Sequence, residues 1–229
     1  MDNTFFVHRR RPFVTRSFAP LTNASQGPFG EVLRFARERF SGTVGRSTTL
    51  PKVFAKLNPV PALERPDLLP ATVIDAVRAY VPSTLVFEVD PAHADTETLC
   101  QVYDLPMDVM ANAVLVLGRR GGDDRYACCM TLAHRRVDVN NVARRKLDVR
   151  KASFAPMEFA VEASGMEYGG ITPVGLPADW PVWVDGAVAD TELVCIGAGI
   201  RGAKLLLAGA DLLKLPTAER VDDLARGIG

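Results

Sequence analysis

The sequence predicts an α+β domain with a central, mostly antiparallel or mixed β-sheet, partly barrel-like and flanked by helices. Apolar residues recur at helical spacing in four segments, 71–81, 96–104, 138–147 and 156–165. Short runs rich in apolar and β-branched residues occur at 84–89, 113–118, 126–133, 182–184, 193–196 and 204–207. Helices and strands do not alternate regularly along the chain, which argues against a sheet built from repeated strand–helix–strand units.

A basic extension, residues 1–66, is predicted to precede the domain, residues 67–229. The chain has a formal net charge of +0, but residues 1–56 contain ten Lys and Arg against three Asp and Glu. One short helix is expected near residues 29–40, and the prolines up to residue 70 are typical of a linker. The Arg-rich start is open to three interpretations: a solvated tail, an RNA-contacting arm or an organellar targeting segment.

Composition and cysteine usage narrow the class of protein. No apolar run approaches the roughly 20 residues of a transmembrane helix, so we expect no membrane span. Four cysteines occur without a C-x-x-C pair, and adjacent Cys128 and Cys129 would point to opposite faces of a strand. His8, His93 and His134 are scattered. These features predict a cytoplasmic protein with no metal site and no cofactor.

The predicted domain opens with two helices around a strand. Pro70 suits the first turn of a helix, which must end before Pro82 because proline cannot continue the hydrogen-bond ladder. The β-branched run at 84–89 should be a strand. Asp95 or Thr96 can then cap the second helix, because either side chain can accept a hydrogen bond from a first-turn N–H.

A hairpin and two further helices are expected next. Asn112 precedes an apolar strand, and the polar turn at 119–124 joins this strand to its neighbour. Asp138 is positioned to cap one helix, while Pro156 begins another that Gly165 ends. Later strands and a short closing helix at residues 210–215 complete the chain.

A glycine-rich loop at residues 167–175, with the sequence EYGGITPVG, separates two apolar segments. Glycine adopts positive φ and lets other groups approach the main chain, while Pro173 stiffens the backbone. Such a loop exposes backbone N–H groups that can hold a carbonyl or a developing oxyanion. A sharp connection between strands is the alternative reading of the same residues.

Two other patterns have competing explanations. The run from Gly197 to Gly202 is a literal G-x-G-x-x-G after a predicted strand, as in a dinucleotide site. The residues that follow read as a strand rather than as the helix that such a site needs, which favours a tight turn. Asp185 follows a buried strand, where it can orient a ligand amine or cap the turn.

The order and spacing of five segments resemble the YbaK family. Members of this family are aminoacyl-tRNA editing domains, free-standing or inserted in bacterial prolyl-tRNA synthetases. The resemblance covers about residues 67–229, and its carriers are residues 112–116, 137–143, 169–175, 184–185 and 199–202. The Gly-Gly-Ile-Thr-Pro-Val-Gly element at 169–175 is the most specific of them.

The resemblance implies hydrolysis of the ester that joins a wrong amino acid to tRNA. It implies that the loop lines the aminoacyl pocket and holds the ester carbonyl through Gly169, Gly170, Ile171, Thr172 and Pro173. The attacking group would be water or the thiol of a cysteine substrate. Asn112 would be the polar partner. Further substrate-binding positions are implied at Thr96, Asp138, Asp185, Gly199, Arg201 and Gly202, with residues 199–202 as the opposite wall.

Two departures from the family pattern concern positive charge. Typical members have a lysine where Asn112 stands, and asparagine can donate a hydrogen bond but carries no charge. A Lys-Lys pair common in the family is replaced by Asn140-Asn141, although residues 144–146 are all basic.

Three functions therefore compete. The first is a trans-editing deacylase whose partners are aminoacyl-tRNA and, as a candidate, an aminoacyl-tRNA synthetase. The second is a non-catalytic module that binds an aminoacyl end or an amino-acid-like ligand. The third is a nucleotide-binding oxidoreductase, which depends on the G-x-G-x-x-G match alone. The sequence leaves the oligomeric state open.

Overall fold

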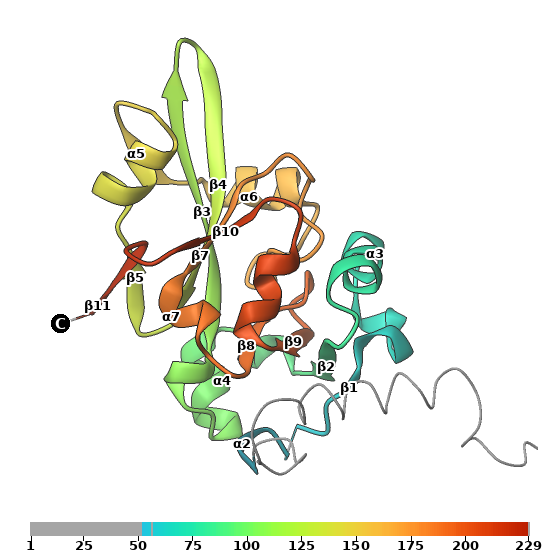
Figure 1. Ribbon diagram of the computed structural model, residues 1–229. Coiled ribbons are helices and arrows are strands. Elements are labelled where there is room, and N and C mark those ends of the chain that lie inside the picture. Colours follow the sequence, from blue (N-terminus) through green and yellow to red (C-terminus); the bar gives the residue numbers. More distant parts are fainter. Residues whose placement is uncertain (1–51, 56, 229) are drawn as a thin grey trace, which may run out of the picture.

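The computed structural model describes residues 52–55 and 57–228, so the Arg-rich start of the chain and the helix expected near residues 29–40 lie outside the described residues. The described chain is a mixed α+β domain with two main sheets and several helices, which confirms the predicted fold class (Figure 1). Its strands do not close into a barrel, so the expected barrel-like character is not found in this part of the chain.

A four-stranded antiparallel sheet forms one half of the framework. Its spatial order is β1 (Val60–Pro61), β2 (Leu85–Glu88), β9 (Ala203–Leu207) and β8 (Val194–Gly197). β9 pairs with both β2 and β8, and all five of its residues are buried. A strand buried on both faces should be apolar throughout, and Lys204 is the exception in β9.

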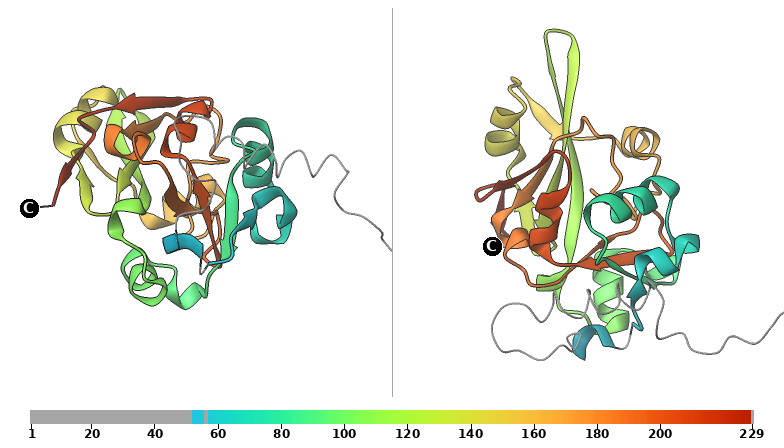
Figure 2. Two further views of the ribbon diagram at one scale, coloured as in Figure 1. Left: turned by 60° about the horizontal axis from the view of Figure 1, so that its bottom comes forward. Right: turned by 45° about the vertical axis from the view of Figure 1, so that its right-hand side comes forward.

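A five-stranded mixed sheet forms the other half. Its spatial order is β10 (Ala218–Val221), β7 (Val182–Asp185), β4 (Asp123–Leu132), β3 (Ala111–Arg120) and β6 (Ala152–Phe154). β3 and β4 form the predicted hairpin, which turns at Gly121 and Gly122, both at positive φ. The tip of this hairpin stands clear of the other elements in Figure 1 and in the right-hand view of Figure 2. A small separate sheet pairs β5 (Arg135–Val137) with β11 (Ala225–Gly227).

The main helices begin and end where their capping residues predict. α3 (Ala71–Tyr80) follows Pro70, and α4 (Thr96–Tyr103) is capped by Asp95, whose carboxylate accepts a hydrogen bond from the Thr98 N–H. α6 (Met157–Ser164) ends at Gly165, which has φ 66°. The helix expected after Asp138 starts with a π-helical turn (Val139–Ala143) and continues as α5 (Arg144–Lys146).

Short helices fill the connections. They are α2 (Lys52–Ala55), α7 (Gly186–Ala189) and the 3-10 helices Ala62–Glu64, Pro66–Leu68, Pro91–His93, Met107–Val109 and Gly209–Lys214. The last of these is the closing helix expected at residues 210–215, in 3-10 form. None of the helices within the described residues is both long and apolar enough to cross a membrane.

Three hydrophobic clusters lie on the faces of the two sheets. Cys128 belongs to the largest cluster and Cys129 to a second, which confirms that these adjacent side chains point to opposite faces of β4. The third cluster joins α4 and α2 to the sheet that contains β9. The segment before residue 67 contributes to this packing, because β1 pairs with β2 and Ala62 is fully buried. The division of the chain at residue 66 remains a prediction.

Several short elements are absent from the sequence-based prediction. They are β1, β5, β6, β10, β11 and α7, none longer than four residues. Segments this short do not show a measurable hydrophobic period, and the strands among them are defined by pairing with segments elsewhere in the chain. β11, for example, contains the charged residue Arg226, and its three residues pair with residues 135–137 of β5.

Candidate active site

A cavity of about 280 Å³ lies where the two main sheets meet. The start of β3 runs beside β8, and an isolated parallel bridge joins Met110 to Cys195. The cavity is lined from β3 and β8, from the start of α4, from the glycine-rich loop and from β9. It therefore lies at the end of the β3–β4 hairpin that is opposite the tip, close to α4 (Figure 1).

Asn112 and Thr96 form a hydrogen-bonded pair in this cavity. The Thr96 hydroxyl donates to Asn112 Oδ1 over 3.0 Å, and both residues line the cavity. Thr96 is the first residue of α4 and Asn112 is the second of β3, so the hydrogen bond joins the start of the helix to the start of the strand. No partner within the described residues engages the Asn112 Nδ2 group, so its two N–H donors are available to a ligand.

Two residues of the glycine-rich loop line the cavity. They are Gly169, at φ 80°, and Ile171. Gly170 lies between them and packs on the backbone of the β8–β9 turn: a Cβ atom there would lie 2.5 Å from the carbonyl carbon and oxygen of Ile200. The Gly170 carbonyl also accepts a hydrogen bond from the Gly199 N–H over 2.7 Å. Glycine at position 170 therefore allows the loop and the turn to contact each other backbone to backbone.

Arg201, in the β8–β9 turn, forms hydrogen bonds to the same loop. Its guanidinium donates to the carbonyl oxygens of Tyr168 at 3.2 Å and Pro91 at 3.0 Å, while its own N–H donates to the Glu167 carboxylate at 2.7 Å. Arg201 also lines the cavity. Its planar group thus links three segments that surround the site.

Lys204 is the feature of this cavity that the sequence analysis missed. It comes from β9, lines the cavity and is only 5% exposed. Its Nζ atom donates to the Gly169 carbonyl oxygen over 3.2 Å. Burial holds the pKa of Lys204 below its usual value. Its only mark in the sequence is that it is a polar residue inside the apolar run 203–207.

Two further ionisable groups of the cavity are Asp95 and Cys195. The pKa of Asp95 is held low by hydrogen bonds from Thr98, so its carboxylate is ionised at neutral pH. Burial raises the pKa of Cys195 to about 12, so its thiol stays protonated. A protonated thiol is a weak nucleophile. No group of three His, Cys, Asp or Glu side chains suited to a metal ion occurs among the residues that the structure describes.

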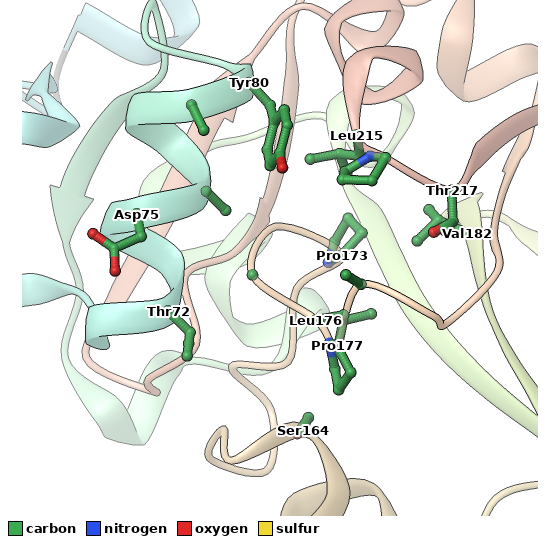
Figure 3. Close-up of a pocket in the computed structure, with 15 residues that line it drawn as sticks. Thr72, Asp75, Tyr80, Ser164, Pro173, Leu176, Pro177, Val182, Leu215 and Thr217 are labelled. Carbon is green, nitrogen blue, oxygen red and sulfur yellow. The ribbon is translucent and has the colours of Figure 1, made fainter.

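Thr172 and Pro173 do not line this cavity. Thr172 is fully buried, and its hydroxyl accepts from the Val174 N–H at 3.5 Å. Pro173 lines a second cavity of about 480 Å³, between α3 and the segments 173–178 and 215–217 (Figure 3). Figure 3 shows Tyr80, Pro173, Leu176 and Leu215 around this space. The second cavity is larger, but no Lys or Arg of the described residues lines it, whereas Arg201 and Lys204 line the smaller cavity, so we place the site in the smaller one.

Asp185 and Asp138 lie elsewhere. Asp185 is completely buried, and its carboxylate accepts from the Ala187 and Ala225 N–H groups at 3.1 and 2.9 Å. It therefore caps α7, one of the two readings of its sequence position, and ties β11 to that helix. Asp138 caps the π-helical turn through Asn141 and pairs with Arg226. Neither carboxylate lines the cavity.

The run from Gly197 to Gly202 is a turn between antiparallel strands. β8 ends at Gly197, β9 begins at Ala203, and the two strands pair directly. No helix follows the glycines, so the dinucleotide interpretation is wrong and the tight turn is confirmed. Within the turn Gly197 and Arg201 line the cavity, while Gly199 and Gly202 do not.

Comparisons with known proteins agree with this architecture. The model of the aminoacyl-tRNA editing domain family matches residues 90–215, a range that contains every residue lining the cavity. A candidate trans-editing enzyme for prolyl-tRNA synthetase has a similar structure, with a TM-score of 0.58 and 20% identity over 69% of this chain and 99% of that chain. The hypothetical protein APE2540 gives a TM-score of 0.60 and 17% identity over 68% and 99%. At these identities the structural likeness concerns the fold.

Proposed function

Because this chain belongs to the aminoacyl-tRNA editing domain family, we propose that it is an aminoacyl-tRNA deacylase that acts in trans on mischarged tRNA. The observation that carries the proposal is the cavity shared by Thr96, Asn112, Gly169 and Ile171, where unpaired donors converge. Its volume of about 280 Å³ is just below the roughly 300–1,000 Å³ of small-molecule sites. It suits an aminoacyl group and its ester, with the rest of the tRNA outside.

The loop would hold the ester carbonyl through its main chain. The Gly170 N–H already donates to the Glu167 carbonyl oxygen at 2.9 Å and is not available. The N–H groups of Gly169 and Ile171 have no hydrogen-bond partner among the described residues, and both residues line the cavity. Fixed backbone donors stabilise an oxyanion effectively because they need no reorganisation during the reaction.

Asn112 and Asp95 would orient the rest of the substrate. Thr96 holds the Asn112 carbonyl oxygen, which leaves the amide N–H groups for the ribose or the ester. Asp95 is the carboxylate that lines the cavity, and it is exposed, so we assign the substrate α-ammonium to it. Asp185, the other candidate for this role, is fully buried and occupied by two backbone N–H groups.

Water is the proposed nucleophile. Cys195 is the cysteine that lines the cavity, and its raised pKa keeps it protonated. The aminoacyl ester is labile, so positioning and electrostatic stabilisation are enough to accelerate its hydrolysis.

Incubation of the protein with a panel of tRNAs, each charged with a wrong amino acid, tests this function. We expect release of free amino acid from at least one member of the panel, above the rate without protein. The alternative function, a non-catalytic module, is favoured by the neutral Asn112 and predicts saturable binding of the charged tRNA without release. A protein that neither releases amino acid nor binds any charged tRNA would refute both.

A further inference from the structure

We propose that Lys204 is a catalytic residue whose ammonium group binds the ester carbonyl oxygen and the oxyanion that forms from it. This inference rests on the deacylase function proposed above. It assigns to β9 the positive charge that Asn112, a neutral residue on β3, does not supply.

The position of Lys204 fits this role. In β9 it pairs with Gly197 of β8 on one side and with Phe87 of β2 on the other, so its backbone is fixed in the middle of a sheet. Its side chain reaches the cavity, where one of the three ammonium N–H donors binds the Gly169 carbonyl oxygen at 3.2 Å. The other two donors have no partner among the described residues. Gly169 also contributes a free N–H to the cavity, so both donors would meet one substrate oxygen.

The environment of Lys204 is unusual for a structural lysine. Residue 204 is 5% exposed, and no carboxylate within the described residues forms an ion pair with it. Asp95 lines the same cavity and attracts the ammonium electrostatically, but it is not at ion-pair distance. A buried ammonium without a direct ion pair destabilises the folded state, and such groups occur mainly where a ligand or transition state provides the missing charge. If residue 204 only had to fill space in β9, an uncharged side chain would be sufficient.

The chemical step balances without any further reagent. The oxygen of water forms a bond to the ester carbonyl carbon, and the carbonyl electron pair moves onto its oxygen beside Lys204. When the carbonyl reforms, the bond to the ribose oxygen breaks, and the proton lost by the water passes to that ribose oxygen. The products are a free amino acid and tRNA with a free ribose hydroxyl, and Lys204 keeps its proton throughout.

Asn112 provides a matched position for a test. It lines the same cavity as Lys204 but belongs to a different strand and a different sheet. A lysine at residue 112 would present its ammonium to the same space. If the reaction needs a cation in the cavity, Asn112→Lys should therefore compensate for the loss of Lys204, whereas it could not replace a structural link between β9 and Gly169.

The experiment compares kcat/KM for deacylation by four proteins: the wild type, Lys204→Met, the double variant Asn112→Lys/Lys204→Met and Lys214→Met. Methionine has a similar length and no charge. Lys214 is a partly exposed surface lysine outside the cavity and serves as the control. We expect a loss of at least 100-fold in Lys204→Met, recovery to within tenfold of wild type in the double variant, and no more than a twofold change in Lys214→Met. Far-UV circular dichroism and the thermal midpoint show whether each variant is folded.

The outcomes separate the two proposals. An active wild type with an equally active, folded Lys204→Met variant would overturn the role of Lys204 and leave the deacylase function intact. A folded Lys204→Met variant that loses activity, with no recovery in a folded double variant, would also overturn it, because the charge would then not be what the cavity requires. A wild type that is inert on the whole panel of charged tRNAs would overturn the deacylase function and the role of Lys204 together.

Discussion

The ammonium nitrogen of Lys204 lies 3.2 Å from the carbonyl oxygen of Gly169, so a cation from a buried strand reaches the glycine-rich loop. This contact joins the sheet of β8 and β9 to the segment that is most specific for the family. It also brings a positive charge into the cavity that Asn112 lines with a neutral amide.

Removal of this charge should make the protein more stable at neutral pH. Lys204→Met replaces a buried, unpaired ammonium by an apolar group, and the gain should exceed the loss of one hydrogen bond, for a net increase of about 1 kcal/mol in the free energy of unfolding. Urea denaturation of both proteins at pH 7 measures the difference. A decrease in stability would mean that the link to Gly169 is mainly structural.

Deacylation should depend on pH through Lys204. Burial lowers the folded-state pKa of Lys204 below 10.5, so the ammonium, and with it the catalysed rate, is lost as the pH rises through that lowered value. Other charged or titratable groups that line the cavity are Asp95, Tyr168, Cys195 and Arg201. Lys204→Arg should shift the falling limb to higher pH because a guanidinium does not lose its proton in this range.

The stability of the wild type should rise with pH over the range in which Lys204 loses its proton and the deacylation rate falls. The unfolded chain holds the Lys204 proton up to a higher pH than the folded chain, so the wild type becomes more stable as pH rises through the folded-state pKa. The stability advantage of Lys204→Met should therefore shrink at alkaline pH. Denaturation curves across the pH range test the change in stability. Deacylation rates across the same range, corrected for uncatalysed hydrolysis, test the change in activity.

Gly170→Val should displace the loop from the β8–β9 turn. The new Cβ atom would lie 2.5 Å from backbone atoms of Ile200, which cannot rotate away. We expect a loss of about 1–3 kcal/mol in stability and at least a 100-fold loss of deacylation measured where the variant is still folded. Gly227→Val is the control, since a Cβ atom there meets nothing within 4 Å, and it should keep full activity. Equal activity of the two variants would contradict the role of the loop.

Arg201→Met should loosen the loop and leave the core intact. The variant loses the two hydrogen bonds to the carbonyl oxygens of Tyr168 and Pro91. We expect about a tenfold loss of kcat/KM, comparable to the loss of one or two hydrogen bonds of about 1 kcal/mol each. Arg78→Met removes a surface arginine whose one ion pair among the described residues is with Asp75 on α3, and it should have no effect. Steady-state kinetics of both variants measure the difference.

Asp185→Ala should reduce stability without a direct effect on catalysis. The buried N–H of Ala225 and the partly buried N–H of Ala187 would lose their acceptor, at roughly 1–3 kcal/mol for a buried unsatisfied group. We expect kcat/KM of the folded variant to remain within threefold of wild type, because Asp185 does not line the cavity. A large increase in KM together with unchanged stability would instead indicate that Asp185 binds the substrate amine.

The long elements of this fold could be predicted because their signals are local. α3, α4 and α6 follow from apolar spacing and from caps such as Asp95 and Gly165, and the β3–β4 hairpin follows from two apolar runs around a polar turn. Strands β5, β6, β10 and β11 depend on partners distant in the sequence, and their own residues carry too little periodicity to reveal them.

The candidate site was predictable only in part. Asn112, Gly169 and Arg201 could be selected because family-like motifs contain them, whereas Thr96 lies outside those motifs and at the predicted start of a helix. Lys204 could not, since its importance depends on β9 crossing the junction between two sheets, and a single lysine in an apolar run does not reveal which space it faces. Asp185 and Asp138 were selected as binding residues but act as caps, because sequence alone does not separate a buried acceptor of backbone N–H groups from a ligand-facing carboxylate.

The most direct measurement is the release of amino acid from mischarged tRNA by the wild type and by Lys204→Met, followed in parallel under single-turnover conditions. The account predicts rapid release by the wild type from at least one charged tRNA, and release by folded Lys204→Met that is slower by at least 100-fold. Absence of release by the wild type from every charged tRNA, or equal release by the two proteins, would contradict it.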